Sequence, residues 1–259
     1  MSAPLFAARG LDKRFGAVVA ADNVTVEIAA GETVGIIGAN GAGKTTFVNM
    51  VTGYLKPDDG VILFRGADIT RMPPREVTRL GIRRSFQVAQ LFPNLSVRDN
   101  ALVALVCAER TRPKPTAILR TSARLAQANE ILARLGIEGF ADRPTLELPQ
   151  GQRKLLDIAL AMVGRSAVLL LDEPTSGISA QEKLPLMDLV MEAVAAESAA
   201  VLFVEHDMEV VERYAPRVIA FYEGRVIADG MAAVVLGDAD VRRYVVGAEL
   251  HRRTDGVQA

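Results

Sequence analysis

The chain has 259 residues, of which 50% are hydrophobic and 24% charged, and its formal net charge is −1. This composition allows one large domain or a core with a subdomain, and the absence of a basic excess argues against a nucleic-acid-binding surface. The longest apolar runs, residues 167–171 and 199–204, are far shorter than the roughly 20 residues of a membrane-spanning helix. The N-terminus also lacks a signal-peptide pattern, so we expect a cytoplasmic protein that can still dock onto a membrane partner.

The first part of the chain has the pattern of strands followed by a helix. Residues 5–28 alternate apolar and polar in two stretches, which predicts short antiparallel strands. Residues 34–38 form an apolar run that ends in glycine, which is typical of a buried parallel strand. Residues 45–54 are then expected to form a helix, and a turn leads to another strand at residues 61–64.

The character of the sequence changes near residue 92. Apolar residues recur at helical spacing in residues 97–108 and 123–135, which predicts a mostly helical subdomain inserted into an α/β core. The single cysteine, Cys107, cannot form a disulfide within the chain, and we expect it to be a buried small hydrophobe. Strand patterns separated by helices return further on, which predicts a parallel sheet. These strands are expected at residues 167–171, 201–204 and 218–222.

A glycine-rich segment follows the first predicted parallel strand. It fits the pattern G-x-x-x-x-G-K-[ST]. Glycines let successive N–H groups point at phosphate oxygens, and the start of the next helix adds its positive dipole end. Lys44 would reach the β and γ phosphates, and the Thr45 hydroxyl would bind magnesium. The residues expected to contact the nucleotide here are Gly38, Asn40, Gly41, Ala42, Gly43, Lys44, Thr45 and Thr46.

Two further apolar strands end in residues that can act on a nucleotide. One ends in Asp172 and Glu173; Asp172 would hold magnesium, and Glu173 would polarise the attacking water as general base. An acidic turn closing a strand is the alternative, and the phosphate loop disfavours it. His206 ends another strand, where it can hydrogen-bond the γ-phosphate, although a histidine that only caps a strand end is the simpler explanation of this residue taken alone.

A third motif, Leu148-Pro149-Gln150-Gly151-Gln152, stands before the acidic strand. With the phosphate loop and the acidic pair, it resembles the signature of the ATP-binding subunits of ABC transporters, and the resemblance covers residues 5–247. It implies an α/β fold: a P-loop NTPase (RecA-like) core with an N-terminal antiparallel β subdomain and an inserted α-helical subdomain. Within a single ABC ATPase domain, residues 1–91 and 156–247 are expected to form the core, residues 92–155 the helical signature subdomain, and residues 248–259 a tail.

The same resemblance implies roles for individual residues. Phe15 matches the aromatic residue that stacks on adenine, and Gln87 matches the glutamine loop, which touches magnesium and water and contacts the membrane partner. His206 matches the switch histidine, which reverses the simpler explanation above. Gln150, Gly151 and Gln152 would close over the nucleotide of a second subunit. The implied catalytic residues are Lys44, Gln87, Glu173 and His206, and the implied metal ligands are Thr45, Gln87 and Asp172.

Two positions depart from the family pattern. Pro149 replaces the signature serine, and Ser179 replaces the aspartate of the D-loop. Proline has neither a hydroxyl nor an N–H group. Either this branch relies on the glycine amides and the helix end, or the site is weakened. We favour the first, because the other site residues are all present: Lys44, Asp172, Glu173 and His206.

Details around the glutamine loop indicate a subfamily. Residues 83–87 and 91–100, together with residues 204–208 and 241–247, resemble importers for branched-chain amino acids, although urea and other amide importers share much of this pattern. The resemblance implies ATP and Mg²⁺ as cofactors, permease subunits and a second identical or related ATP-binding subunit as partners, and a periplasmic binding protein as an indirect one. It places the chain on the cytoplasmic face of the inner membrane. A soluble ABC protein without a transport role and a regulatory subunit with little catalysis are the alternatives.

Overall fold

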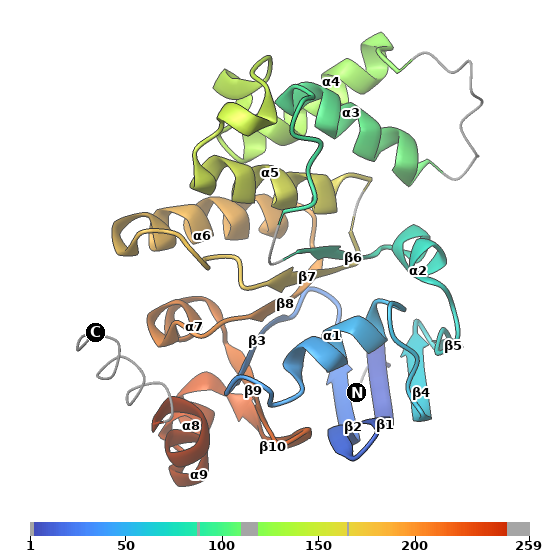
Figure 1. Ribbon diagram of the computed structural model, residues 1–259, viewed down its shortest axis with the longest axis vertical. Coiled ribbons are helices and arrows are strands. Elements are labelled where there is room, and N and C mark those ends of the chain that lie inside the picture. The colour runs from blue at the N-terminus through green and yellow to red at the C-terminus, as the bar shows by residue number, and fades with distance from the viewer. Residues whose placement is uncertain (1–2, 87–88, 110–118, 165, 248–259) are drawn as a thin grey trace. The chain divides into compact units, whose positions relative to one another are not determined.

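The computed structural model describes residues 3–86, 89–109, 119–164 and 166–247 (Figure 1). The chain divides into two compact units, one formed by Met1–Val77 with Leu202–Ala259 and the other by Thr78–Val201. The predicted helical subdomain, residues 92–155, falls inside the second unit by number, and its boundaries remain a prediction.

The first unit contains an antiparallel sheet with the strand order β2-β1-β4-β5. Strands β1 (Phe6–Phe15) and β2 (Val18–Ile28) pair with Phe6 opposite Ile28, as the alternating pattern of residues 5–28 predicts. Alternate side chains of a strand point to opposite faces, so one face of this sheet takes the apolar side chains. β4 (Asp59–Phe64) and β5 (Ala67–Asp68) complete it.

The same unit contains the strand and helix that carry the glycine-rich segment. β3 (Thr33–Gly38) is buried along nearly its whole length, which fits a parallel strand covered on both faces. It pairs in parallel with β9 (Arg217–Tyr222), with Gly35 opposite Val218. α1 (Lys44–Val51) follows β3 directly, as Figure 1 shows.

The remaining elements of this unit are an antiparallel edge strand, the segments that lead to the other unit, and the last helices. β10 (Arg225–Met231) runs antiparallel to β9 and alternates between exposed and half-buried residues, as an edge strand does. β8 (Ala200–Val204) and α2 (Pro74–Leu80) lie at the points where the chain passes between the units. The last helices are α7 (Met208–Tyr214), α8 (Ala232–Gly237), α9 (Ala239–Val241) and the π-helix Arg242–Val246.

The second unit combines two parallel strands with helices. β6 (Ile82–Ser85) pairs with β7 (Val168–Asp172), with Ser85 opposite Leu171. The helices of this unit include α3, α4 and α5, which pack on one another through a small apolar cluster (Figure 1). Its helical elements are α3 (Val97–Ala108), α4 (Ser122–Arg134), α5 (Gln150–Met162), α6 (Ala180–Ala195) and the 3₁₀ turns Glu138–Phe140 and Thr145–Glu147.

Helix α3 begins and runs as its sequence pattern predicts, but the prediction for Cys107 is wrong. Ser96 caps the helix by accepting a hydrogen bond from the Asp99 N–H at 3.0 Å. The buried face consists of Val97, Asn100, Ala101 and Leu102. Cys107 is exposed, because it lies in the last turn of the helix, whereas the buried residues all lie in its first half.

Within the described ranges, no helix has the length and apolar character needed to cross a membrane.

Candidate functional site

The glycine-rich loop between β3 and α1 has the geometry of an anion cradle. Gly43 caps α1 with a left-handed backbone (φ 102°), so the loop turns directly into the helix. The buried Lys44 side chain folds back, and its Nζ atom donates to the carbonyl oxygens of Gly38 at 2.5 Å and Ala39 at 3.1 Å. The amine thus lies against the loop, at the N-terminal end of the helix, where an anion is favoured.

Two glycines of this loop are required by the backbone around them. A Cβ atom on Gly38 would lie 2.6 Å from the Phe221 carbonyl oxygen, and one on Gly43 would lie 2.5 Å from the Ala20 carbonyl oxygen. Larger residues at either position would have to push backbone away from the loop. The glycine spacing of the motif therefore reflects close packing of the cradle as well as its turn.

The outer residues of the loop face solvent. Asn40, Gly41 and Thr45 are exposed, whereas Ala42 is buried and Thr46 is half-buried. An exposed hydroxyl at the first turn of α1 would be accessible to a magnesium ion bound together with a nucleotide. The structure thus leaves three of the predicted contact residues, Asn40, Gly41 and Thr45, accessible to a ligand.

Phe15, the predicted adenine-stacking residue, ends β1 in the same unit. The residue is 51% exposed, which is unusual for a phenylalanine. The Lys13 ammonium lies 5.7 Å from the ring centroid, within the range of a cation–π contact. An exposed aromatic face of this kind can stack on a nucleobase, and that role remains a prediction.

His206 follows β8, also in the unit of the phosphate loop. The half-buried histidine donates its backbone N–H to the Glu205 carboxylate at 3.2 Å. Glu205 is itself buried, and its backbone N–H donates to the Ile36 carbonyl of β3 at 3.2 Å. His206 therefore directly follows Glu205, whose backbone is hydrogen-bonded to β3, the strand that ends at Gly38.

The acidic pair belongs to the second unit. β7 is buried throughout and ends at Asp172, as the apolar run predicts. The Asp172 Oδ2 atom accepts from Arg84 Nη2 at 2.5 Å, and both side chains are buried. Glu173 is half-buried and has a left-handed backbone (φ 48°), which is uncommon for a residue other than glycine. Such strain is often found at functional sites.

The signature segment leads into α5, with Leu148 buried and Pro149 and Gln150 exposed. Pro149 is the N-cap residue of this helix, with φ −57°, where its missing N–H breaks no helical hydrogen bond. Gln150 is exposed, and Gly151 and Gln152 are half-buried. The departure at Pro149 therefore leaves the helix start intact and offers its first N–H groups to a ligand.

The D-loop departure also has a local explanation. Ser179 is the N-cap of α6, and its hydroxyl donates to the Glu182 Oε2 atom at 2.6 Å. Serine followed three residues later by glutamate has the sequence of a capping box, but the Ser179 side chain makes no hydrogen bond to the backbone of the helix start, and the contact joins the two side chains instead. Just before it, Gly177 lies against the signature, since a Cβ there would be 2.1 Å from Gln150 Nε2.

Gln87, the predicted glutamine-loop residue, lies outside the described residues. The residues on either side of it contact two charged side chains that the sequence analysis missed, Lys154 and Asp157 of α5. Burial raises the pKa of Asp157, while the Phe86 N–H and the Lys154 charge oppose this shift. The available signal was two charged residues, three apart, within the apolar stretch of a helix.

Asp172, the one acidic residue among the predicted magnesium ligands, does not belong to a cluster of potential metal ligands in the described residues. Among the described residues, no group of three or more His, Cys, Asp or Glu could hold a metal ion. Thr45 and Asp172 instead offer a hydroxyl and a carboxylate, the hard oxygen donors that magnesium takes together with substrate phosphates. The donor chemistry fits the ion, provided that the nucleotide supplies the other oxygens.

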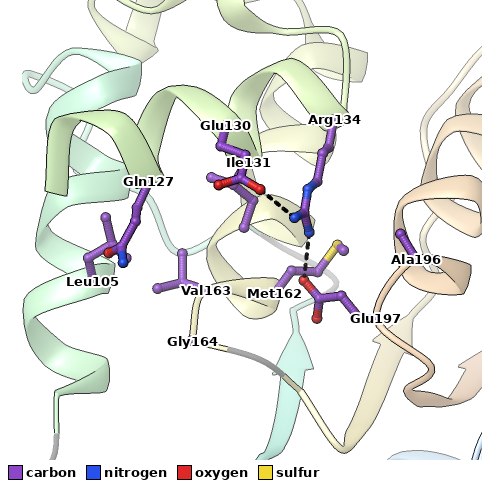
Figure 2. A pocket seen from close by; sticks show the side chains of 10 residues that line it. All are labelled: Leu105, Gln127, Glu130, Ile131, Arg134, Met162, Val163, Gly164, Ala196 and Glu197. Atoms are coloured by element: carbon purple, nitrogen blue, oxygen red, sulfur yellow. Dashed lines mark hydrogen bonds and ion pairs between the residues drawn. The ribbon is translucent and has the colours of Figure 1, made fainter. Parts of the chain in front are cut away.

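A cavity of about 450 Å³ lies among the helices of the second unit and contains none of the predicted site residues (Figure 2). Arg134 lines it and pairs with Glu130 at 2.6 Å and with Glu197 at 3.2 Å, which ties α4 to the end of α6. Ile131 and Met162 form part of its apolar wall. Its charged side chains thus already serve a structural ion-pair network.

The strand β3, the glycine cradle and the lysine at the start of α1 together define a P-loop NTPase. Residues 21–176 match the ABC transporter family. The high-affinity branched-chain amino acid transport ATP-binding protein LivG of Escherichia coli K12 is 34% identical over 253 residues, which cover 95% of this chain and 99% of LivG. The corresponding protein BraF of Pseudomonas aeruginosa is 32% identical, with the same coverage.

Solved structures of ATP-binding cassettes share the fold. MJ1267, an ATP-binding cassette of an ABC transporter, in its ADP conformation, matches with a TM-score of 0.83 at 29% identity, over 94% of this chain and 98% of that one. The bacterial cassette MJ0796, solved as a dimer, matches with a TM-score of 0.77 at 25% identity, over 88% and 98%. The chain therefore belongs to the ABC transporter family, as one of its ATP-hydrolysing cassettes. The predicted fold class and family are confirmed.

Proposed function

We propose that this chain powers the uptake of branched-chain or related hydrophobic amino acids, as the ATP-hydrolysing subunit of an importer. The observation that carries the proposal is the phosphate loop, in which the buried Lys44 amine crosses back to the Gly38 carbonyl at the start of α1. The named activity of relatives that match nearly end to end, LivG and BraF, supports the choice of cargo.

The residue roles follow from their chemistry. Lys44 and the N–H groups from Gly38 to Thr46 bind the phosphates, and Phe15 stacks on the adenine. Magnesium, when bound, neutralises charge on the β and γ phosphates; Thr45, Asp172 and Gln87 are its proposed ligands. Glu173 takes a proton from the attacking water, and His206 hydrogen-bonds the γ-phosphate.

A second ATP-binding subunit completes the proposed site. The N-terminal turn of α5, at Gln150, Gly151 and Gln152, would contact the nucleotide held by the partner cassette. The dimeric cassette MJ0796 supports an arrangement of two such subunits. Transmembrane permease subunits would receive the movement, and a periplasmic binding protein would deliver the cargo. The chain would then work at the cytoplasmic face of the inner membrane.

The catalytic part of the proposal is tested with a Glu173→Gln variant. The full chain should hydrolyse ATP with Mg²⁺, and the variant should lose turnover while retaining ATP and accumulating an ATP-bound dimer. The amide keeps the shape of the side chain but cannot take a proton. Turnover at the unmodified rate in Glu173→Gln would remove Glu173 from the role of base.

The cargo is tested by uptake into cells that lack the gene for this chain. Labelled leucine uptake should fall, and should be restored by the unmodified chain but not by Glu173→Gln. Restored uptake of labelled urea, with leucine unaffected, would favour the amide-importer alternative. Unchanged uptake of both compounds would leave an ATPase without this transport role, as in the soluble alternative.

A further inference from the structure

Two buried charges of α5, Lys154 and Asp157, have no part in the roles proposed above. Both residues are 5% exposed. They stand three residues apart in the helix and therefore lie on the same face. Burying a charge is costly unless it is paired and hydrogen-bonded, so the contacts of these two residues indicate what they hold in place.

Asp157 binds the backbone around the glutamine loop. Its Oδ2 atom accepts from the Phe86 N–H at 2.9 Å, and its Oδ1 atom accepts from the Gln90 N–H at 3.3 Å. Phe86 and Gln90 bracket Gln87 in the sequence. One carboxylate on the signature helix therefore anchors both ends of the segment that contains Gln87.

Lys154 connects that segment to the acidic strand. Its Nζ atom donates to the Phe86 carbonyl at 3.1 Å and to the Asp172 carbonyl at 3.3 Å. The Asp172 carbonyl belongs to the peptide that joins Asp172 to Glu173. Phe86 is thus held at its N–H by Asp157 and at its carbonyl by Lys154. Lys154 also holds the backbone just before Glu173, the proposed base.

We propose that Lys154 and Asp157 are positioning residues that link the signature helix, the glutamine loop and the Asp172–Glu173 peptide, so that a movement of one displaces the others. The inference rests on the proposed function for the roles of Gln87 and Glu173. In a transporter, this link would carry a movement at the glutamine loop to the general base and to the N-terminal turn of α5. Both residues act through backbone and touch no substrate.

The first test measures amide hydrogen exchange in the nucleotide-free full-length chain. In Asp157→Ala, the amides of Phe86 and Gln90 lose their acceptors and should exchange at least ten-fold faster than in the unmodified chain. Asp157→Asn keeps one carbonyl oxygen and should give an intermediate rate. Arg134→Met is the matched control, because it breaks an ion pair elsewhere in the same unit and should leave these amides unchanged.

The second test separates positioning from binding. Lys154→Met and Asp157→Ala should lower kcat for ATP hydrolysis at least ten-fold, while the affinity for a fluorescent ATP analogue stays within two-fold, because the phosphate loop belongs to the other unit. Lys154→Arg can still donate to both carbonyls and should recover much of the rate. The Arg134→Met control should keep its kcat.

Distinct outcomes overturn the proposal. Unchanged exchange at Phe86 and Gln90 in Asp157→Ala would show that the carboxylate does not hold this segment. A kcat within two-fold of the unmodified value in both Lys154→Met and Asp157→Ala, or an equal fall in Arg134→Met, would show that the residues have no specific positioning role. Neither measurement involves the cargo, so a failure of leucine uptake would refute the proposed function and leave this result standing.

Discussion

Arg84 and Asp172 form a buried ion pair, in which the Arg84 Nη2 atom lies 2.5 Å from the Asp172 Oδ2 atom. They come from adjacent parallel strands, since Arg84 of β6 is paired with Leu170 of β7. The carboxylate that we propose as a magnesium ligand is thus already neutralised by a guanidinium. A buried acid without a partner would be costly, so Arg84 holds this strand end together.

The first prediction follows from that pair. Arg84→Met should lower the free energy of unfolding of the magnesium-free chain by about 3 kcal/mol, because it strands a buried carboxylate. Urea denaturation measures this loss. Arg134→Met, which removes a more exposed arginine from its ion pairs, should cost at most about 1 kcal/mol. Equal losses in the two variants would contradict the prediction.

The same variant tests Asp172 as a metal ligand. Magnesium would supply the positive charge that Arg84→Met lacks, so Mg²⁺ with ATP should raise the midpoint of urea denaturation more in the variant than in the unmodified chain. ATP with EDTA serves as the metal-free comparison. An identical shift in the two proteins would speak against Asp172 as a ligand.

The second prediction concerns the packing of the phosphate loop. Gly43→Ala would place a Cβ atom 2.5 Å from the Ala20 carbonyl oxygen on a backbone with φ 102°. Gly41→Ala meets nothing within 4 Å, although its φ of 83° is also positive. Gly41→Ala should therefore cost about 1–2 kcal/mol from its backbone alone, and Gly43→Ala clearly more. Denaturation curves that rank Gly41→Ala as the more damaging change would contradict this account.

Local patterns predicted much of the fold. The alternation in residues 5–28 predicted β1 and β2, the apolar run at residues 34–38 predicted β3, and helical spacing predicted α3 and α4. β6 was missed, because Ile82-Arg83-Arg84-Ser85 shows no alternation and puts two arginines into a strand. Distant partners help these arginines to tolerate burial, Asp172 for Arg84 and the Gly164 carbonyl for Arg83.

The candidate site also has a part that the sequence predicts and a part that it does not. The phosphate loop was predictable because its strand, glycines and helix are adjacent in the sequence. Lys154 and Asp157 were not, because Asp157 is 71 residues from Phe86 and Lys154 is 68 from it. The sequence pattern marked α5 as a helix but did not indicate which backbone groups its buried charges would contact. The individual site residues remain predictions, for which the structure supplies placement and contacts.

The third prediction addresses Pro149. Serine is a favoured N-cap residue, so Pro149→Ser should leave the start of α5 intact and keep the free energy of unfolding within about 1 kcal/mol of the unmodified value. If the family's contact between this serine and the γ-phosphate applies, the ATP-bound dimer formed in a Glu173→Gln background should become more stable. Pro149→Ala is the control without a hydroxyl. Equal dimer dissociation constants for the serine and alanine variants would show that a hydroxyl at position 149 does not stabilise the ATP-bound dimer.

The last prediction concerns Ser179, where the family pattern has aspartate. The Ser179 hydroxyl donates to Glu182 at 2.6 Å at the start of α6, so Ser179→Ala, which removes this exposed side-chain hydrogen bond, should lower the free energy of unfolding by at most about 1 kcal/mol. Aspartate is also a favoured N-cap residue. In Ser179→Asp, however, the ionised side chain cannot donate a hydrogen bond, and it would place a second carboxylate beside Glu182. We therefore expect Ser179→Asp to be less stable than Ser179→Asp combined with Glu182→Gln, in which the amide can donate to the aspartate. Chemical denaturation of the three variants checks this order. Equal stability of Ser179→Asp with and without Glu182→Gln would show that the contact with Glu182 does not determine which residue fits at position 179.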